Sequence, residues 1–87
     1  GRGRNSFYLA SKGFSVTALD LLKENADHVV NQAHLMKLPI HAYAQSAAEA
    51  WPISSNSLDL AIDIFCYKHI TNKDAQASYR NELARTL

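Results

Sequence analysis

Two glycines and one carboxylate near the start of the chain have the types and the spacing that could bind a nucleotide. Gly1 and Gly3 precede a short amphipathic run, and Asp20 lies 17 residues after Gly3 at the end of an apolar stretch. Glycines allow a backbone to approach a ligand closely, and the start of a following helix offers unpaired N–H groups. A carboxylate at the carboxyl end of the next strand can accept hydrogen bonds from ribose hydroxyls. The order of these residues predicts a nucleotide-binding α/β unit.

The elements that would position these residues alternate between helix and strand. The pattern predicts helices over residues 5–12, 23–37 and 71–87, and strands over residues 14–19, 40–44 and 58–66. Asn5 or Ser6 can cap the first helix, and Gly13 stands where a glycine would end it. The run at 58–66 has the strongest strand pattern, because both of its faces are largely apolar, as in a parallel sheet covered by helices. This alternation predicts an α/β fold with a Rossmann-like, doubly wound, mostly parallel sheet.

Apolar side chains at helical spacing mark the helix faces that should be buried. In the long helix these are Ala26, Val29, Val30, Ala33 and Met36, and Pro39 ends this helix. In the last helix they are Ala75, Tyr79, Leu83 and Leu87. Thr71 and Asp74 form a near capping box at its start.

Composition and charge argue against several classes of protein. The 87 residues are 47% hydrophobic and 20% charged, with a net charge of +1, as in an ordinary globular chain. The basic face or aromatic platform of a nucleic-acid-binding protein is absent, and no apolar run approaches the roughly 18 residues of a membrane span. Cys66 is the only cysteine, so no disulfide can form within the chain. We therefore expect a cytoplasmic protein without nucleic-acid or membrane partners.

Several segments, taken in order, resemble class I S-adenosylmethionine-dependent methyltransferases. The first two segments are similar to the end of the family's glycine-rich motif and to its second strand with the ribose-binding acid: Gly1-Arg2-Gly3-Arg4-Asn5-Ser6 and Gly13-Phe14-Ser15-Val16-Thr17-Ala18-Leu19-Asp20. The next are similar to a loop and the fourth strand: Ala48-Glu49-Ala50-Trp51-Pro52 and Ser57-Leu58-Asp59-Leu60-Ala61. The last resemble the segment after that strand and the following helix: Phe65-Cys66-Tyr67-Lys68-His69-Ile70 and Glu82-Leu83-Ala84-Arg85-Thr86-Leu87. The resemblance spans essentially the whole chain and is closest to the small-molecule and tellurite-resistance-type branch.

This resemblance implies a cofactor and an acceptor. The cofactor would be S-adenosylmethionine, and the protein would transfer its methyl group to a small-molecule acceptor. The implied cofactor-binding residues are Gly1, Gly3, Asn5, Asp20, Leu21, Ala47, Ala48 and Phe65. Many family members place an aspartate just before an alanine in the adenine-side loop, where this chain has Gln45-Ser46-Ala47-Ala48. Ser46 or a backbone group would have to take over the role of that aspartate.

The resemblance also implies that residues 1–87 form one partial methyltransferase domain. The family's first strand would precede Gly1, and the strands that complete its seven-stranded sheet would follow Leu87. Three strands without their neighbours would leave long edges and uncovered apolar faces. We therefore expect a chain that is marginally folded and inactive by itself.

Four residues each allow two interpretations. His69 could act as a general base near neutral pH, or it could cap the next helix or bond to a loop. Methyl transfer often needs only proximity and alignment, so the catalytic residue is unknown and His69 is its one weak candidate. Trp51 is either a core anchor or a stacking partner for adenine, and Asn5 is either a helix cap or a ligand contact. Asp63 either lies near the cofactor edge or is satisfied by an outside partner. The spacing of the histidines predicts no metal site.

An alternative function is that of a nicotinamide- or flavin-binding Rossmann domain in an oxidoreductase. Such a domain also uses a glycine turn and an acid at the end of a strand. Against it, Ser6 replaces the third glycine of that fingerprint. A third alternative, a non-enzymatic interaction or nucleic-acid-binding protein, would need the basic face that this sequence lacks.

Overall fold

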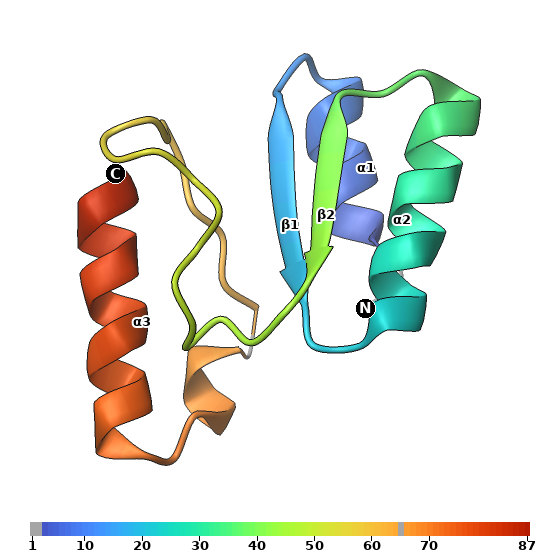
Figure 1. Ribbon diagram of the computed structural model, residues 1–87. Coiled ribbons are helices and arrows are strands. Elements are labelled where there is room, and N and C mark those ends of the chain that lie inside the picture. Colours follow the sequence, from blue (N-terminus) through green and yellow to red (C-terminus); the bar gives the residue numbers. More distant parts are fainter. Residues whose placement is uncertain (1–2, 65) are drawn as a thin grey trace. The chain divides into compact units, whose positions relative to one another are not determined.

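The chain consists of two compact units, Gly1–Ser46 and Ala47–Leu87, in a computed structural model that describes residues 3–64 and 66–87. The elements of the first unit are α1 (Arg4–Ser11), β1 (Val16–Asp20), α2 (Lys23–Met36) and β2 (Ile40–Ala44) (Figure 1). Those of the second unit are the 3-10 turn η1 (Tyr67–His69) and α3 (Lys73–Thr86). The two predicted helices and the two predicted strands of the first unit are therefore confirmed, with boundaries shifted by one or two residues.

The β1–β2 sheet is parallel, as predicted. Its register runs from the pair Val16–Ile40 to the pair Asp20–Ala44, and α2 connects the two strands. Both helices contribute to one core on one face of this sheet (Figure 1). The buried residues of that core are Ala10, Val29, Ala33 and Ile40. The α/β class is confirmed, but among the described residues of the first unit no helix covers the other face of β1 and β2, so this unit by itself does not show the doubly wound arrangement.

The first helix is bounded by glycines. Gly3 has a left-handed backbone, with φ at 91°, and is the N-cap of α1. The prediction that Asn5 or Ser6 is the cap is wrong, because the turn at Gly3 starts the helix earlier and places both residues in its first turn. At the other end Gly13, with φ at 97°, stops the helix as predicted.

The apolar stripe of α2 is narrower than predicted. Ala26, Val29 and Ala33 are buried, but the side chains of Val30 and Met36 are 44% and 55% exposed. The prediction for these two residues is wrong because a sheet of two strands covers only a narrow strip of the helix surface. The helix does end before the proline at position 39.

The strand predicted over residues 58–66 is absent from the described part of this segment. Leu60, Ile62 and Ile64 are 54%, 52% and 55% exposed. An alternating apolar pattern forms a strand only when a neighbouring strand satisfies its backbone groups. The prediction is wrong because, among the described residues, no strand pairs with this segment.

The cap of the last helix lies one residue later than predicted. The Asn72 side chain, not that of Thr71, accepts a hydrogen bond from the Ala75 N–H at 3.0 Å and caps α3. Tyr79 is buried, and Ala75 is half-buried, as expected for the inner face. Leu83 is also half-buried, but Leu87 is 50% exposed because it lies beyond the last turn, so that part of the predicted stripe is wrong.

Candidate functional site

Gly3 forms a turn that only glycine accommodates. A Cβ atom at this position would lie 2.7 Å from Val29 Cγ2 and 3.0 Å from Phe7 Cε2. The positive φ is a second obstacle, because side chains disfavour the left-handed region. The Gly3 carbonyl accepts the first intrahelical hydrogen bond from the Phe7 N–H at 2.9 Å. At the start of α1, the Gly3 backbone therefore lies close to α2 with no side chain between them.

Asp20 ends β1 and has a half-buried carboxylate. Its Oδ1 accepts hydrogen bonds from the Leu22 N–H at 2.9 Å and from the Asn25 side-chain amide at 3.3 Å. Burial raises the pKa of the Asp20 carboxyl, whereas the hydrogen bonds from Leu22 and Asn25 act in the opposite direction and favour the ionised form. The carboxylate is therefore held ionised and in a fixed orientation at the carboxyl end of the strand.

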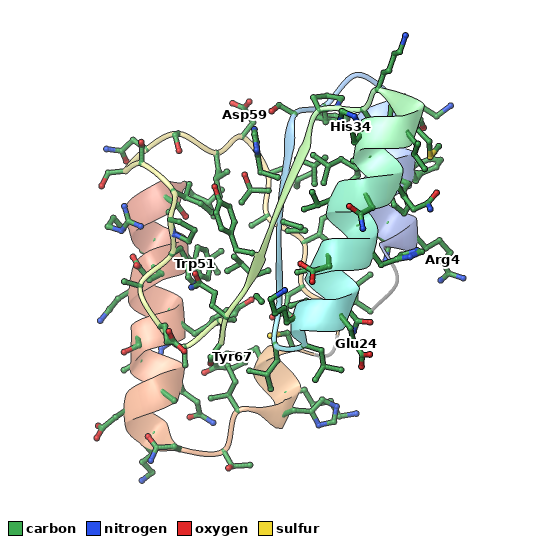
Figure 2. All side chains as sticks on the ribbon, turned by 45° about the vertical axis from the view of Figure 1, so that its right-hand side comes forward. Arg4, Glu24, His34, Trp51, Asp59 and Tyr67 are labelled. Carbon is green, nitrogen blue, oxygen red and sulfur yellow. The ribbon has the colours of Figure 1, made fainter. Side chains whose placement is uncertain are left out.

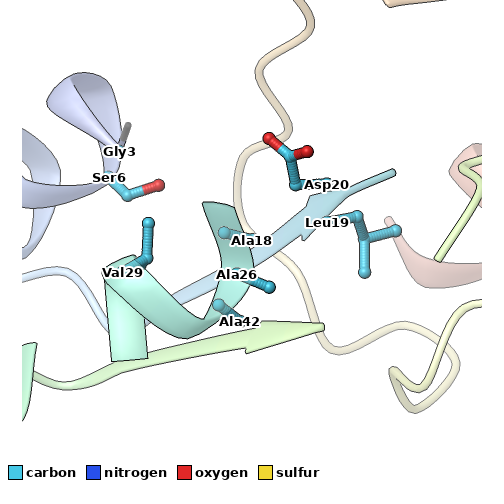
Figure 3. A pocket seen from close by; sticks show the side chains of 8 residues that line it. All are labelled: Gly3, Ser6, Ala18, Leu19, Asp20, Ala26, Val29 and Ala42. Atoms are coloured by element: carbon cyan, nitrogen blue, oxygen red, sulfur yellow. The ribbon is translucent and has the colours of Figure 1, made fainter. Parts of the chain in front are cut away.

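Gly3 and Asp20 line the same hollow in the first unit. This hollow has a volume of about 90 Å³ (Figure 3). Its lining residues are Gly3, Ser6, Ala18, Leu19, Asp20, Ala26, Val29 and Ala42. The fold thus brings Gly3 and Asp20, two predicted site residues distant in sequence, to one hollow between α1, β1 and α2. The hydroxyl group of Ser6 lies at the same hollow.

The other predicted site residues of this unit do not line the hollow. Asn5 is exposed in the first turn of α1, and Leu21 is 73% exposed just after β1. The Arg4 side chain extends from the surface of α1 (Figure 2). Gly1 lies outside the described residues.

The second unit holds the predicted residues Ala47 and Ala48 in a half-buried turn. The Ala47 carbonyl accepts a hydrogen bond from the indole Nε1 of Trp51 at 2.8 Å. The Trp51 ring packs edge-on against Tyr79, with 5.6 Å between centroids. This contact supports the interpretation of Trp51 as a core anchor, here of the second unit. Phe65, also predicted to bind cofactor, lies outside the described residues.

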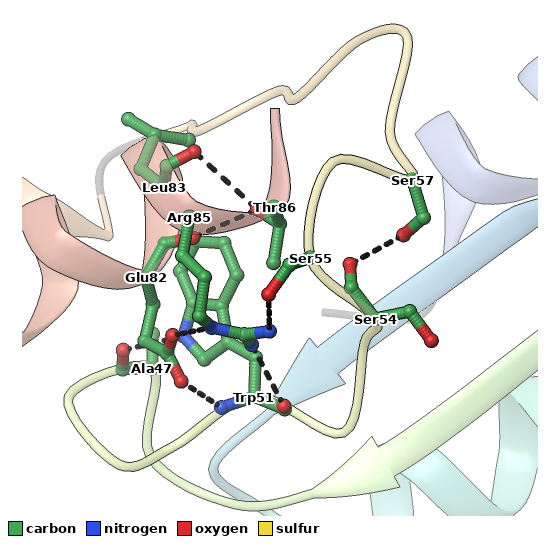
Figure 4. A network of polar contacts seen from close by, with 9 residues as sticks. All are labelled: Ala47, Trp51, Ser54, Ser55, Ser57, Glu82, Leu83, Arg85 and Thr86. Carbon is green, nitrogen blue, oxygen red and sulfur yellow. Dashed lines mark hydrogen bonds and ion pairs between the residues drawn. The ribbon is translucent and has the colours of Figure 1, made fainter.

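The loop around Trp51 is hydrogen-bonded to two side chains of α3 that form an ion pair with each other (Figure 4). The Glu82 carboxylate accepts a hydrogen bond from the Trp51 N–H at 2.7 Å, and it pairs with the Arg85 guanidinium. Arg85 in turn donates to the Trp51 carbonyl and to Ser55 Oγ, each at 3.2 Å. Arg85 together with the Trp51 N–H holds the pKa of the Glu82 carboxyl below its ordinary value.

Asp63 is satisfied within its own unit. Its carboxylate accepts hydrogen bonds from the Cys66 N–H at 2.8 Å, from the Tyr67 N–H at 3.0 Å and from the Tyr79 hydroxyl. Burial alone would raise the pKa of the Asp63 carboxyl, but the bonds from Tyr79 and the two backbone groups lower it below its ordinary value of 3.8. The suggestion of an outside partner is therefore not needed to explain a carboxylate in this apolar segment.

We expect this carboxylate to make the second unit sensitive to acid. Because its pKa is lower in the folded state, Asp63 stabilises the folded state above pH 3.8, and this contribution is lost as the pH falls through the lower folded value. Urea unfolding followed by Trp51 fluorescence, between about pH 6 and pH 2, measures the effect. The Asp63→Asn variant should lose less stability than the wild type as the pH falls. The same acid dependence of stability in both proteins would contradict the prediction.

A second hollow, of about 330 Å³, opens beside this carboxylate. Its lining residues are Asp63, Tyr67, Tyr79, Arg80 and Leu83. The Arg80 guanidinium donates to the Tyr67 hydroxyl at 2.7 Å. His69, the weak catalytic candidate, is exposed at the end of η1 and does not line this hollow.

Sequence reasoning missed the residues that organise the second unit. Glu82 and Arg85 were assigned only to a helix, although opposite charges three residues apart could have indicated a pair. The Tyr79 hydroxyl was not linked to Asp63, because a contact over 16 residues leaves no local pattern. Ser6 lines the first hollow, although the sequence analysis assigned its side chain no ligand contact.

In the described residues, no three His, Cys, Asp or Glu side chains gather around a possible metal position. None of the helices described has the length and apolar character needed to cross a membrane.

One of three comparisons with known proteins found a match. A family model described as "Methyltransferase domain" matches residues 1–87, the whole chain. Searches of curated proteins and of solved structures found no match. The family match confirms the resemblance predicted from the glycine turn, the strand-end acid and the later segments. The chain therefore belongs to the class I S-adenosylmethionine-dependent methyltransferase family.

Proposed function

We propose that the protein binds S-adenosylmethionine at the hollow between α1, β1 and α2 and transfers its methyl group to a small-molecule acceptor. The observation that carries this proposal is that Gly3 and Asp20 line one hollow at the carboxyl end of β1. Ligands of α/β sheets bind at that end of the strands. The small-molecule acceptor is proposed from the resemblance to the small-molecule branch.

The residues present fit this cofactor. Asp20 supplies carboxylate oxygens, which are hydrogen-bond acceptors suited to ribose hydroxyls. The bare backbone at Gly3 allows close approach, and the N–H groups at the start of α1 suit the carboxylate of the methionyl part. The Ser6 hydroxyl adds a further hydrogen-bonding group to the hollow. The further cofactor contacts that we propose are Gly1, Asn5, Leu21, Ala47, Ala48 and Phe65.

Catalysis by this chain would consist mainly of binding and orientation. S-adenosylmethionine supplies a methyl group activated by its sulfonium. Asp20 and the Gly3 turn would fix the cofactor, which leaves alignment with the acceptor as the main requirement. We assign no base, since His69 is exposed and no observed contact ties it to the hollow. The dinucleotide alternative has no support from the family match and is not proposed.

Asp20→Asn is expected to weaken the binding of S-adenosylhomocysteine and S-adenosylmethionine by about 10- to 100-fold. The reason is the loss of charge-assisted hydrogen bonds to ribose hydroxyls, each worth about 1.5–3 kcal/mol. Calorimetric titration of the purified protein measures this loss, with NAD as the competing ligand.

Asp27→Asn is the matched control for this substitution. Asp27 also lies in the first unit, but it is exposed on α2 and pairs with Lys23 at 2.7 Å. The Asp27→Asn variant should bind S-adenosylhomocysteine and S-adenosylmethionine as tightly as the wild type does. Preference for NAD, or unchanged affinity in Asp20→Asn, would overturn the proposed function.

A further inference from the structure

The carboxylate of Asp20 is tied to the first turn of α2 by one backbone group and one side chain. The Leu22 N–H donates to Oδ1 at 2.9 Å, and the Asn25 side-chain amide lies 3.3 Å from Oδ1 and 3.4 Å from Oδ2. Leu22 is the N-cap of α2, and its carbonyl accepts the N–H groups of Asn25 and Ala26 at 3.1 and 3.2 Å. The strand-end carboxylate and the start of the helix therefore share one hydrogen-bonded network.

The backbone bond and the side-chain bond constrain this carboxylate differently. The bond from Leu22 reaches one oxygen only, and rotation about the Cβ–Cγ bond of an aspartate has a broad range. The amide of Asn25 reaches both oxygens, so it restrains the plane in which they lie. Asn25 thus adds an orientation that the backbone bond alone does not supply.

Asn25 is half-buried and does not itself line the first hollow, whereas Asp20 and the next helix residue, Ala26, do (Figure 3). The Asn25 side chain can therefore act on a bound ligand through Asp20. Hydrogen bonds depend on direction as well as on distance. A carboxylate that is already held in one orientation loses less conformational freedom when it accepts bonds from the hydroxyls of a sugar, and this increases affinity.

We infer that Asn25 is a positioning residue that orients the Asp20 carboxylate toward the hydroxyls of a ribose. The inference rests on the proposed function, in which this carboxylate binds the ribose of the cofactor. It makes Asn25 a determinant of the preference for a ribose over a sugar that lacks both hydroxyls. All the residues involved belong to the first unit.

The test compares two ligands that differ only at the sugar. Affinities are measured for S-adenosylhomocysteine and for its 2′,3′-dideoxy analogue by calorimetric titration of the purified protein. Wild type should prefer the ribose ligand by at least about tenfold. Asn25→Ala should bind the ribose ligand at least about fivefold more weakly than wild type and the dideoxy ligand within about twofold of wild type, and so lose most of this preference.

Asn25→Asp is a second variant, which separates the hydrogen bond from the stability of the helix. An aspartate has the size of an asparagine and suits the first turn of a helix, but it has carboxylate oxygens and no amide donor. This variant should lose the ribose preference at least as strongly as Asn25→Ala, while circular dichroism shows the helix content of the wild type.

Asn31→Ala is the matched control. Asn31 is exposed on the same helix and does not line the first hollow. The Asn31→Ala variant should keep both the affinity and the ribose preference of the wild type.

Failure of the proposed function and failure of this inference give different results. If wild type binds neither ligand, the proposed function fails and this inference fails with it. If wild type binds both ligands equally, the cofactor is confirmed, but the ribose contact of Asp20 and the role of Asn25 are overturned. If the Asn25 variants weaken both ligands equally, or keep the preference, only the positioning role is overturned.

Discussion

Tyr79→Ala is expected to destabilise the second unit by about 3 kcal/mol. Tyr79, at 8% exposure, is the most buried aromatic residue among the described residues of this unit, and its ring centroid lies 5.6 and 5.2 Å from those of Trp51 and Tyr67. Truncation removes these contacts, leaves a cavity and deprives Asp63 of a donor. Urea unfolding followed by fluorescence measures the loss, because Trp51 is the only tryptophan and lies in this unit.

Two further variants separate the ring of Tyr79 from its hydroxyl. Tyr79→Phe keeps the ring and should cost only about 1 kcal/mol, since Asp63 is exposed and retains two backbone donors. Tyr8→Ala, at a side chain that is 62% exposed, should change stability by less than about 0.5 kcal/mol. A Tyr79→Ala protein as stable as Tyr8→Ala would contradict the central role of this ring.

Gly3→Ala is expected to destabilise the first unit by about 2–4 kcal/mol. The left-handed backbone costs about 1–2 kcal/mol for a residue with a Cβ, and the contact at 2.7 Å with Val29 forces a shift in the core. Hydrogen exchange of the sheet amides measures this effect, for example at the Val16 N–H, which donates to the Pro39 carbonyl. Cofactor affinity should fall as well, since the same turn lines the hollow.

Gly13→Ala provides the comparison that isolates the close approach. Gly13 has a similar φ of 97°, but a Cβ there would meet nothing within 4 Å. Gly13→Ala should therefore destabilise the first unit by only about 1–2 kcal/mol, the cost of a left-handed backbone, and should leave cofactor affinity unchanged. Equal losses at the two glycines would show that the contact with Val29 contributes nothing.

Local chemistry in the sequence determined most of the first unit. Gly13 ends α1 because the Gly13 and Phe14 N–H groups bond back to the Ala10 and Leu9 carbonyls, a pattern that glycine itself favours. The strand over residues 40–44 was predicted with its observed boundaries. The place of Asp20 after an apolar run predicts a carboxylate at the end of a strand, and Asp20 is the last residue of β1. These signals depend on neighbours within a few residues, so a single sequence carries them.

In the second unit the sequence predicted α3, but tertiary structure decided the rest. Residues 58–66 have the strongest strand pattern, but the described part of that segment is not a strand, because a strand needs a partner that local propensity does not supply. The cluster of Glu82, Arg85 and Trp51 joins residues about 30 positions apart, and sequence spacing does not encode that distance. The meeting of Gly3 with Asp20 in one hollow likewise depends on how α1 packs against α2. The sequence by itself determined which residue types could bind a nucleotide, and packing decided which of them lie together.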